Sequence, residues 1–270
     1  MIKNNYVLIS GATSGIGFEL AKLYAKDGYD LILISRKMDD LANAKEELLK
    51  LNDKIDIKYF PFDLSKIENT YALYEKIKEN NLDVTTLINN AGFGDSKEFV
   101  EADINKLNQM VDLNVKSLMN MCHIFGKDMK EKRSGRILNV ASVAAYIAGP
   151  YMAVYYATKA FVLNFSIGLY HELKKYGVKV HALCPGPTKT KFIDVADSKN
   201  KKTFDNLSMN PTKVAKICYK KMRKNKLIIN TGFISKFTSF GTRFVSRKFA
   251  AKRTEKINGK WYLTSLIKIV

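Results

Sequence analysis

A short apolar run that leads straight into a glycine-rich turn constrains the fold of this chain more than any other feature. Residues 6–10 read YVLIS, glycines follow at positions 11, 15 and 17, and an apolar helical pattern begins at Phe18. A continuous apolar run suits a strand that is buried on both faces of a parallel sheet. The strand, the turn and the helix together predict the first crossover unit of an α/β fold.

Strand and helix patterns then alternate through the first 190 residues. Further strands are predicted at 31–34, 55–60, 86–88, 136–141 and 179–183, and helices at 40–51, 67–79, 104–129 and 153–173. Such alternation implies right-handed crossovers between parallel strands. The sequence therefore predicts a Rossmann-type, doubly wound parallel sheet of about seven strands with helices on both faces.

The glycine turn is the first candidate binding site. Glycines let the backbone approach a phosphate closely, and the N–H groups that open the following helix can bind a pyrophosphate. A plain glycine turn is the alternative interpretation. If a dinucleotide binds here, the expected contacts come from Gly11, Thr13, Ser14, Gly15, Ile16 and Gly17.

The end of the second strand indicates which dinucleotide this is. Arg36 follows Gly17 by 19 residues, where an Asp or Glu would bind the ribose hydroxyls of NAD. Ser35, Arg36 and Lys37 include no acid, and an arginine here accommodates the 2′-phosphate of NADP. The sequence therefore favours NADP(H), with a solvated pair of cations as the alternative.

Polar and turn-forming residues follow the other strands. Ligands bind beyond the carboxyl ends of the strands in such a sheet, so these residues are candidates for the same site. Each could instead cap a helix or form a turn, as Asp, Asn and Gly commonly do. The candidates are Asp63, Leu64, Asn90, Ala91, Gly92, Pro185, Gly186, Thr188 and Thr190.

Residues 142–159 carry the candidate chemistry. Ser142 follows a predicted strand, and Tyr155 and Lys159 stand one turn apart on a predicted helix. A cation beside a phenol favours the ionised phenol, so the pair could act as an acid/base unit. A tyrosine at the edge of the core beside a solvated lysine is the structural alternative. Asn114, on an apolar helix face, is either a satisfied structural amide or part of the same site.

These motifs, in this order, resemble those of the short-chain dehydrogenase/reductase family over roughly residues 5–190. The glycine pattern has Ser10 where the family pattern TGxxxGxG begins with threonine, and serine still supplies a hydroxyl. The matching positions are 10–17, NNAG at 89–92, Asn114, Ser142, YxxxK at 155–159, and the Pro-Gly pair at 185–186 with Thr190.

The resemblance implies an activity and a role for each catalytic residue. It implies an NADP(H)-dependent oxidoreductase that transfers a hydride between nicotinamide and a carbonyl or secondary alcohol. Tyr155 would be the acid/base, and Ser142 would hydrogen-bond the substrate oxygen. Lys159 would lower the pKa of Tyr155 and hold the ribose of the nicotinamide. The resemblance implies that Tyr155 and Lys159 also contact the cofactor. Asn114 would anchor a proton-relaying water, no metal is expected, and the family implies a homo-oligomer, either dimer or tetramer.

The connection at 191–209 is predicted to be a lid over the site. It is polar but contains Phe192 and Phe204, and a connection of this length without secondary structure is often functional. Its aromatic residues indicate a small-molecule carbonyl or alcohol substrate that is partly apolar.

The C-terminal 60 residues carry most of the positive charge. The net charge is +19, of which residues 211–270 contribute +15, with Glu255 as their single acid. Phenylalanines recur there at helical spacing among lysines and arginines, at positions 233, 237, 240 and 244. We expect this stripe to pack on the core or on a second subunit. A basic amphipathic helix on an anionic membrane surface is the alternative.

The length of 270 residues fits a single domain. We divide it into a dinucleotide-binding and catalytic part, 1–210, and a basic, partly helical extension of the same domain, 211–270. Three widely spaced cysteines, Cys122, Cys184 and Cys218, indicate free thiols in a reducing cytoplasm, with peripheral membrane association as a further alternative. No specific nucleic-acid partner is expected. The rival function is a non-catalytic NADP(H) sensor that binds a membrane or nucleic acid through its basic segment.

Overall fold

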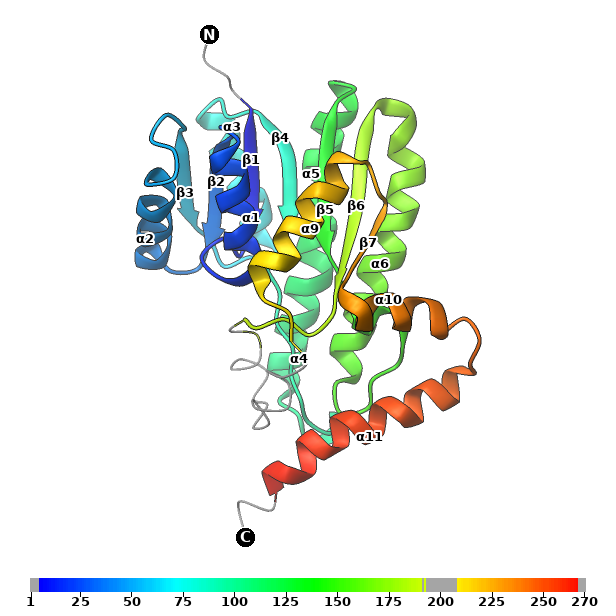
Figure 1. Cartoon of the computed structure of the whole chain (residues 1–270). Helices are drawn as coiled ribbons and strands as arrows, with labels where there is room; N and C mark the ends of the chain where they lie inside the picture. The colour runs from blue at the N-terminus through cyan, green and yellow to red at the C-terminus, as the bar shows by residue number, and fades with distance from the viewer. Residues whose placement is uncertain (1–4, 191, 193–207, 267–270) are drawn as a thin grey trace.

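The chain forms a seven-stranded parallel sheet between two layers of helices (Figure 1). The computed structural model describes residues 5–190, 192 and 208–266, with side chains described through residue 259. The strand order is β3-β2-β1-β4-β5-β6-β7, and each neighbouring pair is parallel. This confirms the predicted doubly wound sheet. The strands are β1 Tyr6–Ser10, β2 Asp30–Ser35, β3 Ile57–Pro61, β4 Val84–Asn89, β5 Gly135–Val140, β6 Val178–Pro185 and β7 Ile228–Thr231.

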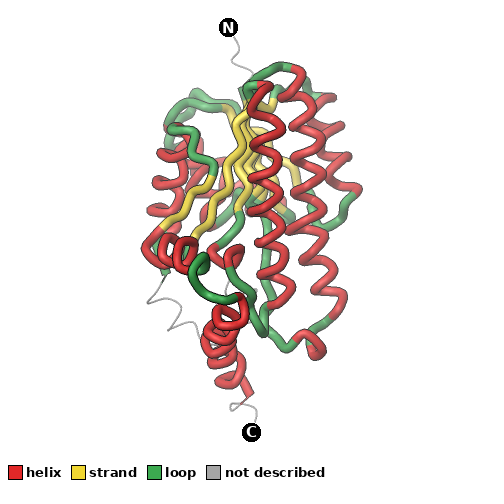
Figure 2. The backbone as a smooth tube through the Cα atoms, turned by 90° about the vertical axis from the view of Figure 1, so that its right-hand side faces the viewer, coloured by secondary structure: helices red, strands yellow, loops and turns green. Residues whose placement is uncertain are grey.

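The helices cover both faces of the sheet, as Figure 2 shows with the yellow strands between red helices. Helices α1, α2 and α9 contribute to one hydrophobic cluster, and α3, α5 and α6 contribute to the other. Helix α4 follows β4, and α10 and α11 end the chain. The helices are α1 Gly15–Lys26, α2 Met38–Leu49, α3 Glu68–Glu79, α4 Ile104–Val111, α5 Leu118–Glu131, α6 Ala153–Leu173, α9 Pro211–Arg223, α10 Gly232–Gly241 and α11 Arg247–Leu266.

Strand β2 illustrates why the apolar runs become central strands. Its side chains alternate between the two faces, so Leu31 and Leu33 enter one cluster while Ile32 and Ile34 enter the other. All four are buried, and full burial of such a side chain stabilises a fold by about 1.5–3 kcal/mol. A run without polar positions is therefore needed where helices cover both faces.

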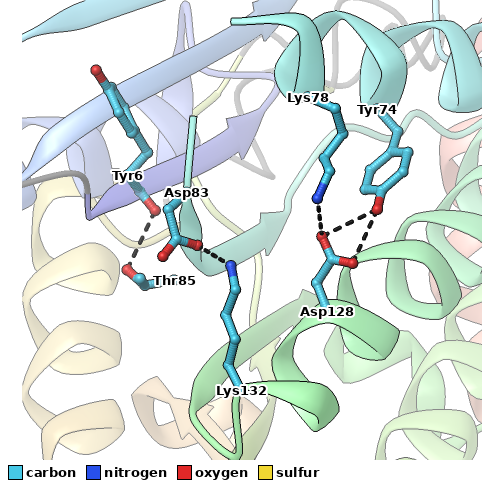
Figure 3. A network of polar contacts seen from close by, with 7 residues as sticks. All are labelled: Tyr6, Tyr74, Lys78, Asp83, Thr85, Asp128 and Lys132. Atoms are coloured by element: carbon cyan, nitrogen blue, oxygen red, sulfur yellow. Dashed lines mark hydrogen bonds and ion pairs between the residues drawn. The ribbon is translucent and has the colours of Figure 1, made fainter. Parts of the chain in front are cut away.

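Polar contacts join α5 to the beginning of β4 and to α3, at the end of the sheet opposite the candidate site (Figure 3). Lys132, which follows α5, pairs with Asp83 just before β4. Tyr74 of α3 donates a hydrogen bond of 3.0 Å to Asp128 of α5, and Lys78 lies 3.7 Å from the same carboxylate. These contacts position α3 and α5 on their face of the sheet.

The C-terminal segment completes the sheet. Strand β7 pairs with β6 through Leu183 and Ile229, among other pairs. Helix α9 packs beside α1, where Tyr219 meets Tyr24 edge to face at 4.8 Å and donates a hydrogen bond to Asp27. The sequence patterns assigned no position to this seventh strand.

Two expectations need correction. The helix predicted over 104–129 is interrupted, because a π-helical turn at Asp112–Ser117 separates α4 from α5. The phenylalanine stripe does not pack on the core: the rings at positions 233, 237, 240 and 244 are all exposed. The prediction that the stripe packs on the core is wrong, because Ser235 lies on the side of α10 that faces the protein. Most of the predicted lid, 191 and 193–207, lies outside the described residues.

No helix in the described part of the chain combines the length and apolar character needed to cross a membrane.

Candidate active site

The glycine turn leaves the N-terminus of α1 open. Gly11 and Gly15 have φ angles of +65° and +58°, a conformation that favours glycine. Ser14 precedes the helix in extended conformation and its side chain forms no capping hydrogen bond. The first turn of α1 contains no acidic residue, so its N–H groups can bind an anionic group.

Close packing explains the third glycine. A Cβ atom at Gly17 would lie 2.4 Å from the carbonyl oxygen of Gly11 and 2.5 Å from Nδ2 of Asn90. The Asn90 amide donates hydrogen bonds of 3.0 and 3.1 Å to the carbonyls of Ser10 and Gly11. Asn90 therefore holds the turn after β1 against the end of β4.

Ser10 reinforces this junction. Its hydroxyl oxygen accepts from the backbone N–H groups of Asn90 (3.0 Å) and Ala91 (3.1 Å). The hydroxyl is also 3.4 Å from the carbonyl of Ile88. Ala91 and Gly92 are thus placed beside the glycine turn at the point where the strand order reverses, which is where doubly wound sheets bind ligands.

The second strand meets the same turn. The hydroxyls of Thr13 and Ser35 lie 3.3 Å apart, so the residue before Arg36 contacts the glycine turn. Arg36 is exposed, and within the described residues no ion pair engages its guanidinium. The cation is therefore available to a ligand that reaches this edge.

Asp63 makes the local contacts of a turn residue. Its Oδ1 accepts hydrogen bonds from the backbone and the side chain of Ser65 at 3.0 and 2.7 Å. Its own carbonyl accepts from Asn69 at 2.8 Å, and Leu64 beside it is buried. The structural interpretation therefore accounts for one carboxylate oxygen of Asp63, and the other oxygen has no hydrogen-bond partner among the described residues.

The loop after β6 reaches the glycine turn from the other side. A Cβ atom at Gly15 would lie 3.0 Å from Cγ2 of Thr190. Thr188 is buried and donates a hydrogen bond of 2.8 Å to the carbonyl of Gly186. Pro185 ends β6, so the segment from Pro185 to Thr190 closes over the start of α1.

Asn114 is held inside the π-helical turn. Its Nδ2 donates to the carbonyl of Phe93 at 2.9 Å and to the hydroxyl of Thr158 at 3.2 Å, and its Oδ1 accepts from Phe93 N–H at 3.2 Å. A Cβ atom at Gly92 would lie 2.8 Å from the same Oδ1. The amide is thus satisfied by the protein apart from one acceptor position on Oδ1, and it joins the loop after β4 to α6.

Ser142, Tyr155 and Lys159 converge at the start of α6. The Ser142 side chain interacts with the Tyr155 phenol and acts to lower its pKa, and the serine hydroxyl accepts a hydrogen bond of 3.1 Å from the backbone N–H of Ala144. Lys159 Nζ lies 5.9 Å from the centre of the Tyr155 ring and donates a hydrogen bond of 2.8 Å to the carbonyl of Val140. The lysine is buried with 6% of its surface exposed, although no carboxylate of the described residues pairs with it.

Burial dominates the protonation of both groups. It raises the pKa of the Tyr155 phenol above its ordinary value of 10.0, and the hydrogen bond to Ser142 offsets only part of this effect. Burial also lowers the pKa of Lys159 from 10.5 to about 8. The expected lowering of the tyrosine pKa by Lys159 is therefore not observed in the protein alone, because desolvation of the phenol dominates the shift and Lys159 is not among the groups that change this pKa.

An apolar hollow lies beside Tyr155. It is lined by the loop after β4, by α4 and by the start of α6, including Phe99, Leu107, Met110 and Met152. Phe192 packs against Tyr155 with ring centres 5.1 Å apart. These side chains form an apolar surface beside the Tyr155 ring.

Comparison with known proteins identifies the family. Residues 5–201 match the family described as short chain dehydrogenase. The chain belongs to the short-chain dehydrogenase family. It is accordingly an oxidoreductase that acts on a carbonyl or alcohol group.

Relatives of this short-chain dehydrogenase extend over much of its length. An uncharacterized oxidoreductase, YvrD, from Bacillus subtilis is 35% identical over 192 residues, 71% of this chain and 72% of the relative. A very-long-chain 3-oxoacyl-CoA reductase from Ajellomyces capsulatus is 32% identical over 182 residues, which is 66% of this chain but only 53% of that protein. Among solved structures, a short-chain dehydrogenase from Sphingobium yanoikuyae in complex with NADPH has a TM-score of 0.78 and 26% identity, covering 89% of this chain and 94% of that chain.

The structure of this short-chain dehydrogenase also links Asn89 of the NNAG motif to two buried residues, Asn139 and Ser166, that the sequence patterns did not assign to the site. Asn89 donates a hydrogen bond of 2.9 Å to Oδ1 of Asn139, whose own Nδ2 donates to Ser166 at 3.0 Å. All three are buried, and together they join β4, β5 and α6 beneath the candidate site. The signal available was Asn139 inside the apolar strand ILNV, since a buried amide needs partners.

The sequence patterns also did not place helix α11 beside the candidate active site. Figure 1 shows it crossing the carboxyl-end side of the sheet. Asn258 donates a hydrogen bond of 2.9 Å to the carbonyl of Pro150, and a Cβ atom at Gly259 would lie 3.0 Å from the ring of Tyr151. Tyr156, beside Tyr155, is directed toward Gly149 and Asn258 instead of the candidate site. The loop between Ser142 and Tyr155 is thus held by a helix about a hundred residues later in the chain.

Proposed function

We propose that the protein is an NADP(H)-dependent oxidoreductase that transfers a hydride between nicotinamide and a carbonyl or secondary alcohol, with Tyr155 as acid/base. The observation that carries this proposal is the convergence of Tyr155, Ser142 and Lys159 beside Gly92, next to the open glycine turn. Asn114 supports the same constellation from the opposite side through Thr158. A structural tyrosine would need neither a buried lysine nor a serine at its hydroxyl.

The glycine turn fits a dinucleotide. Positive φ angles at Gly11 and Gly15 and the uncapped start of α1 leave backbone N–H groups for a pyrophosphate. When bound, NADPH supplies the hydride for reduction of the substrate carbon. In this proposal Lys159, which has two donors besides the one it gives Val140, holds the ribose hydroxyls near the nicotinamide.

The raised pKa of Tyr155 suits the direction of reduction. The phenol stays protonated at neutral pH, so it can donate its proton to the substrate oxygen as negative charge develops there. Ser142 donates a second hydrogen bond to the same oxygen. Lys159, with a pKa of about 8, is mostly charged at pH 7 and stabilises the phenolate that remains. We propose that Asn114 anchors a water through the free acceptor position of Oδ1, linking the lysine to solvent.

We propose NADP(H) over NAD(H) because Arg36 is an exposed cation at the end of β2, where its neighbour Ser35 already contacts the glycine turn. The NADPH complex of the Sphingobium relative agrees with this choice. Asp63, Leu64, Ala91 and the segment Pro185 to Thr190 would line the rest of the cofactor site. Arg36→Asp should weaken NADPH binding about 10- to 100-fold, as loss of a charge-assisted hydrogen bond does, and leave NADH binding equal or tighter. Equal affinity of the unchanged protein for both cofactors would contradict the proposal.

The substrate is proposed to be a partly apolar carbonyl or alcohol compound. The hollow beside Tyr155 presents Phe99, Leu107, Met110 and Met152, and Phe192 covers the tyrosine ring. A 3-oxoacyl-CoA reductase among the relatives makes 3-oxoacyl thioesters one class to include in a screen. Turnover should be followed through NADPH absorbance on thioesters, steroids, sugars and simple ketones, and should favour the more apolar members.

The deciding experiment replaces Tyr155 by phenylalanine. Tyr155→Phe should lower kcat about 10²- to 10⁴-fold, the usual contribution of a proton donor, while NADPH binding stays within a few-fold. Tyr156→Phe is the matched control, since it removes a neighbouring phenol that points toward Asn258, and it should keep near-normal turnover. Full activity of Tyr155→Phe, or no turnover of any carbonyl by the unchanged protein, would refute the proposed function.

We also propose that residues 1–210 and 211–270 fold as one domain and that the protein is a homo-oligomer. The pairing of β7 with β6 and the packing of Tyr219 on Tyr24 support the first proposal. The second is supported by exposed Phe161 on α6, whose ring stacks on Phe165 at 5.5 Å and leaves an apolar surface. A single cooperative unfolding transition and a multiple of the chain mass in sedimentation are expected.

A further inference from the structure

Helix α10 and the start of α11 expose a series of phenylalanine rings. Phe233 is 79% exposed and Phe237 65% exposed. Large contiguous apolar patches are uncommon on soluble monomers and mark interaction surfaces. We call this the aromatic surface, and its members are Phe233, Phe237, Phe240, Phe244, Val245 and Phe249.

The attachment of α10 explains why these rings face outward. Ser235 is buried, donates a hydrogen bond of 2.6 Å to the carbonyl of Cys184, and lies 3.0 Å from Oδ1 of Asn230. Residues two positions apart on a helix lie on opposite sides, so Phe233 and Phe237 point away from the protein. Their rings stack on each other with centres 5.9 Å apart. The exposure therefore follows from the way the helix is anchored.

Positive charge surrounds the aromatic surface. Between residues 211 and 254 the sequence contains no aspartate or glutamate. Within the described residues, none of the cations of 232–254 forms an ion pair, and Arg253 lies over the ring of Phe249 at 5.6 Å. These exposed cations are Lys236, Arg243, Arg247, Lys248, Lys252 and Arg253.

We propose that α10 and the first half of α11 dock the protein on the surface of an anionic lipid bilayer. Exposed phenylalanines enter the boundary between headgroups and acyl chains, and lysines and arginines around them bind anionic headgroups. A second copy of this chain is a poorer occupant, because a symmetric contact through this face would oppose identical positive charges. Nucleic acid would use the cations, but single-stranded nucleic acid is bound along a groove, and this surface is the outer face of a helix.

Residues adjoining the docking surface, Asn230 at the end of β7 and Asn258 farther along α11, contact the loop of the proposed active site. Asn230, which precedes α10, accepts a hydrogen bond of 2.9 Å from the hydroxyl of Tyr146. Asn258 of α11 holds the carbonyl of Pro150. Both partners lie between Ser142 and Tyr155, so a docked molecule would present this loop close to the bilayer. This link rests on the proposed function, whereas the docking itself does not.

Vesicle co-sedimentation tests the docking without substrate or cofactor. The full chain should bind vesicles of phosphatidylcholine with about 30% phosphatidylserine at low salt and should be released at high salt. Phe233→Ser with Phe237→Ser should weaken binding at least about tenfold. Lys248→Gln with Lys252→Gln should weaken it about 20- to 30-fold, because each cation near an anionic surface contributes about fivefold to partitioning.

Matched controls lie elsewhere on the molecule. Tyr71→Ser removes a ring that is 54% exposed on α3, and Lys50→Gln with Lys54→Gln removes two exposed cations near α2. Both controls should bind vesicles like the unchanged protein.

Several outcomes would overturn the docking proposal. Equal binding to pure phosphatidylcholine vesicles, or unchanged binding by both patch variants, would remove its basis. A lower melting temperature or a smaller oligomer for the phenylalanine variant would mean that protein covers this face. Tighter binding to a single-stranded oligonucleotide than to the anionic vesicles would assign the surface to nucleic acid. Because lipid binding and turnover are measured separately, neither result decides the other.

Discussion

Replacing Lys159 by methionine should stabilise the fold while it removes the proposed activity. The pKa of Lys159 falls from 10.5 to about 8 in the folded protein because the ammonium group is buried. A tenfold change in proton affinity is worth about 1.4 kcal/mol, so holding this charge in place costs about 3 kcal/mol at pH 7. Methionine avoids this cost but leaves the carbonyl of Val140 without its 2.8 Å hydrogen bond, a loss of about 1 kcal/mol. Lys159→Met should therefore gain about 2 kcal/mol of stability.

The pH dependence gives the signature of this effect. The folded-state pKa lies below that of the unfolded chain, so the unfolded chain holds more protons between about pH 8 and pH 10.5. The contribution of Lys159 therefore becomes less unfavourable as pH rises through this window. The advantage of Lys159→Met should shrink from about 2 kcal/mol at pH 7 to near zero at pH 9.5.

Urea denaturation of the protein without nucleotide, at both pH values, measures this difference. Lys50→Met is the control, because that lysine is exposed and its replacement should change stability by less than about 0.5 kcal/mol. A Lys159→Met variant that is less stable than the unchanged protein at pH 7 would refute the reasoning. So would a stability difference that is the same at pH 7 and pH 9.5.

Three further predictions concern packing around the site. Gly17→Ala should lower the free energy of unfolding by about 1–3 kcal/mol and weaken NADPH binding, since the added Cβ would lie 2.4 Å from the Gly11 carbonyl. Gly168→Ala is the control: its added Cβ has no neighbour within 4 Å, so the free energy of unfolding in urea should rise by up to about 1 kcal/mol. Asn139→Ala should lower the free energy of unfolding by about 2–4 kcal/mol in urea, because it orphans the buried groups on either side, and a loss below 0.5 kcal/mol would contradict this. Asn258→Ala should lower kcat more than it raises KM for NADPH by loosening the loop before Tyr155, and unchanged kcat would mean that the contact is dispensable.

The sequence predicted the central architecture because its signals are local. The apolar runs, the glycine turn and the helical periodicity each follow from which faces of an element are buried, and six strands lie close to where these patterns place them. Strand β7 was assigned no position because Ile228–Thr231 is only four residues long and follows a strongly basic helix, which hides its period. Its pairing depends on the exposed edge of β6, which is a property of the tertiary structure.

The remaining features depend on contacts between distant residues. The π-helical turn that aims Asn114 leaves no pattern in the sequence around it, and its partners Phe93 and Thr158 lie 21 and 44 residues away. The phenylalanine spacing predicted a helix, and α10 is one, but spacing alone does not say which side faces the core. The buried Ser235 decides that, because its hydrogen bonds to Cys184 and Asn230 fix the rotation of the helix.

The hydrogen bond from Asn258 of α11 to the loop before Tyr155 can form only late in synthesis. Asn258 leaves the ribosome 108 residues after Pro150, the residue whose carbonyl it holds. Strands β1 to β5 can associate while the later part is still being translated, since domains fold progressively as they emerge. A nascent chain arrested before α11 should therefore bind nucleotide, whereas turnover of substrate should require the full chain.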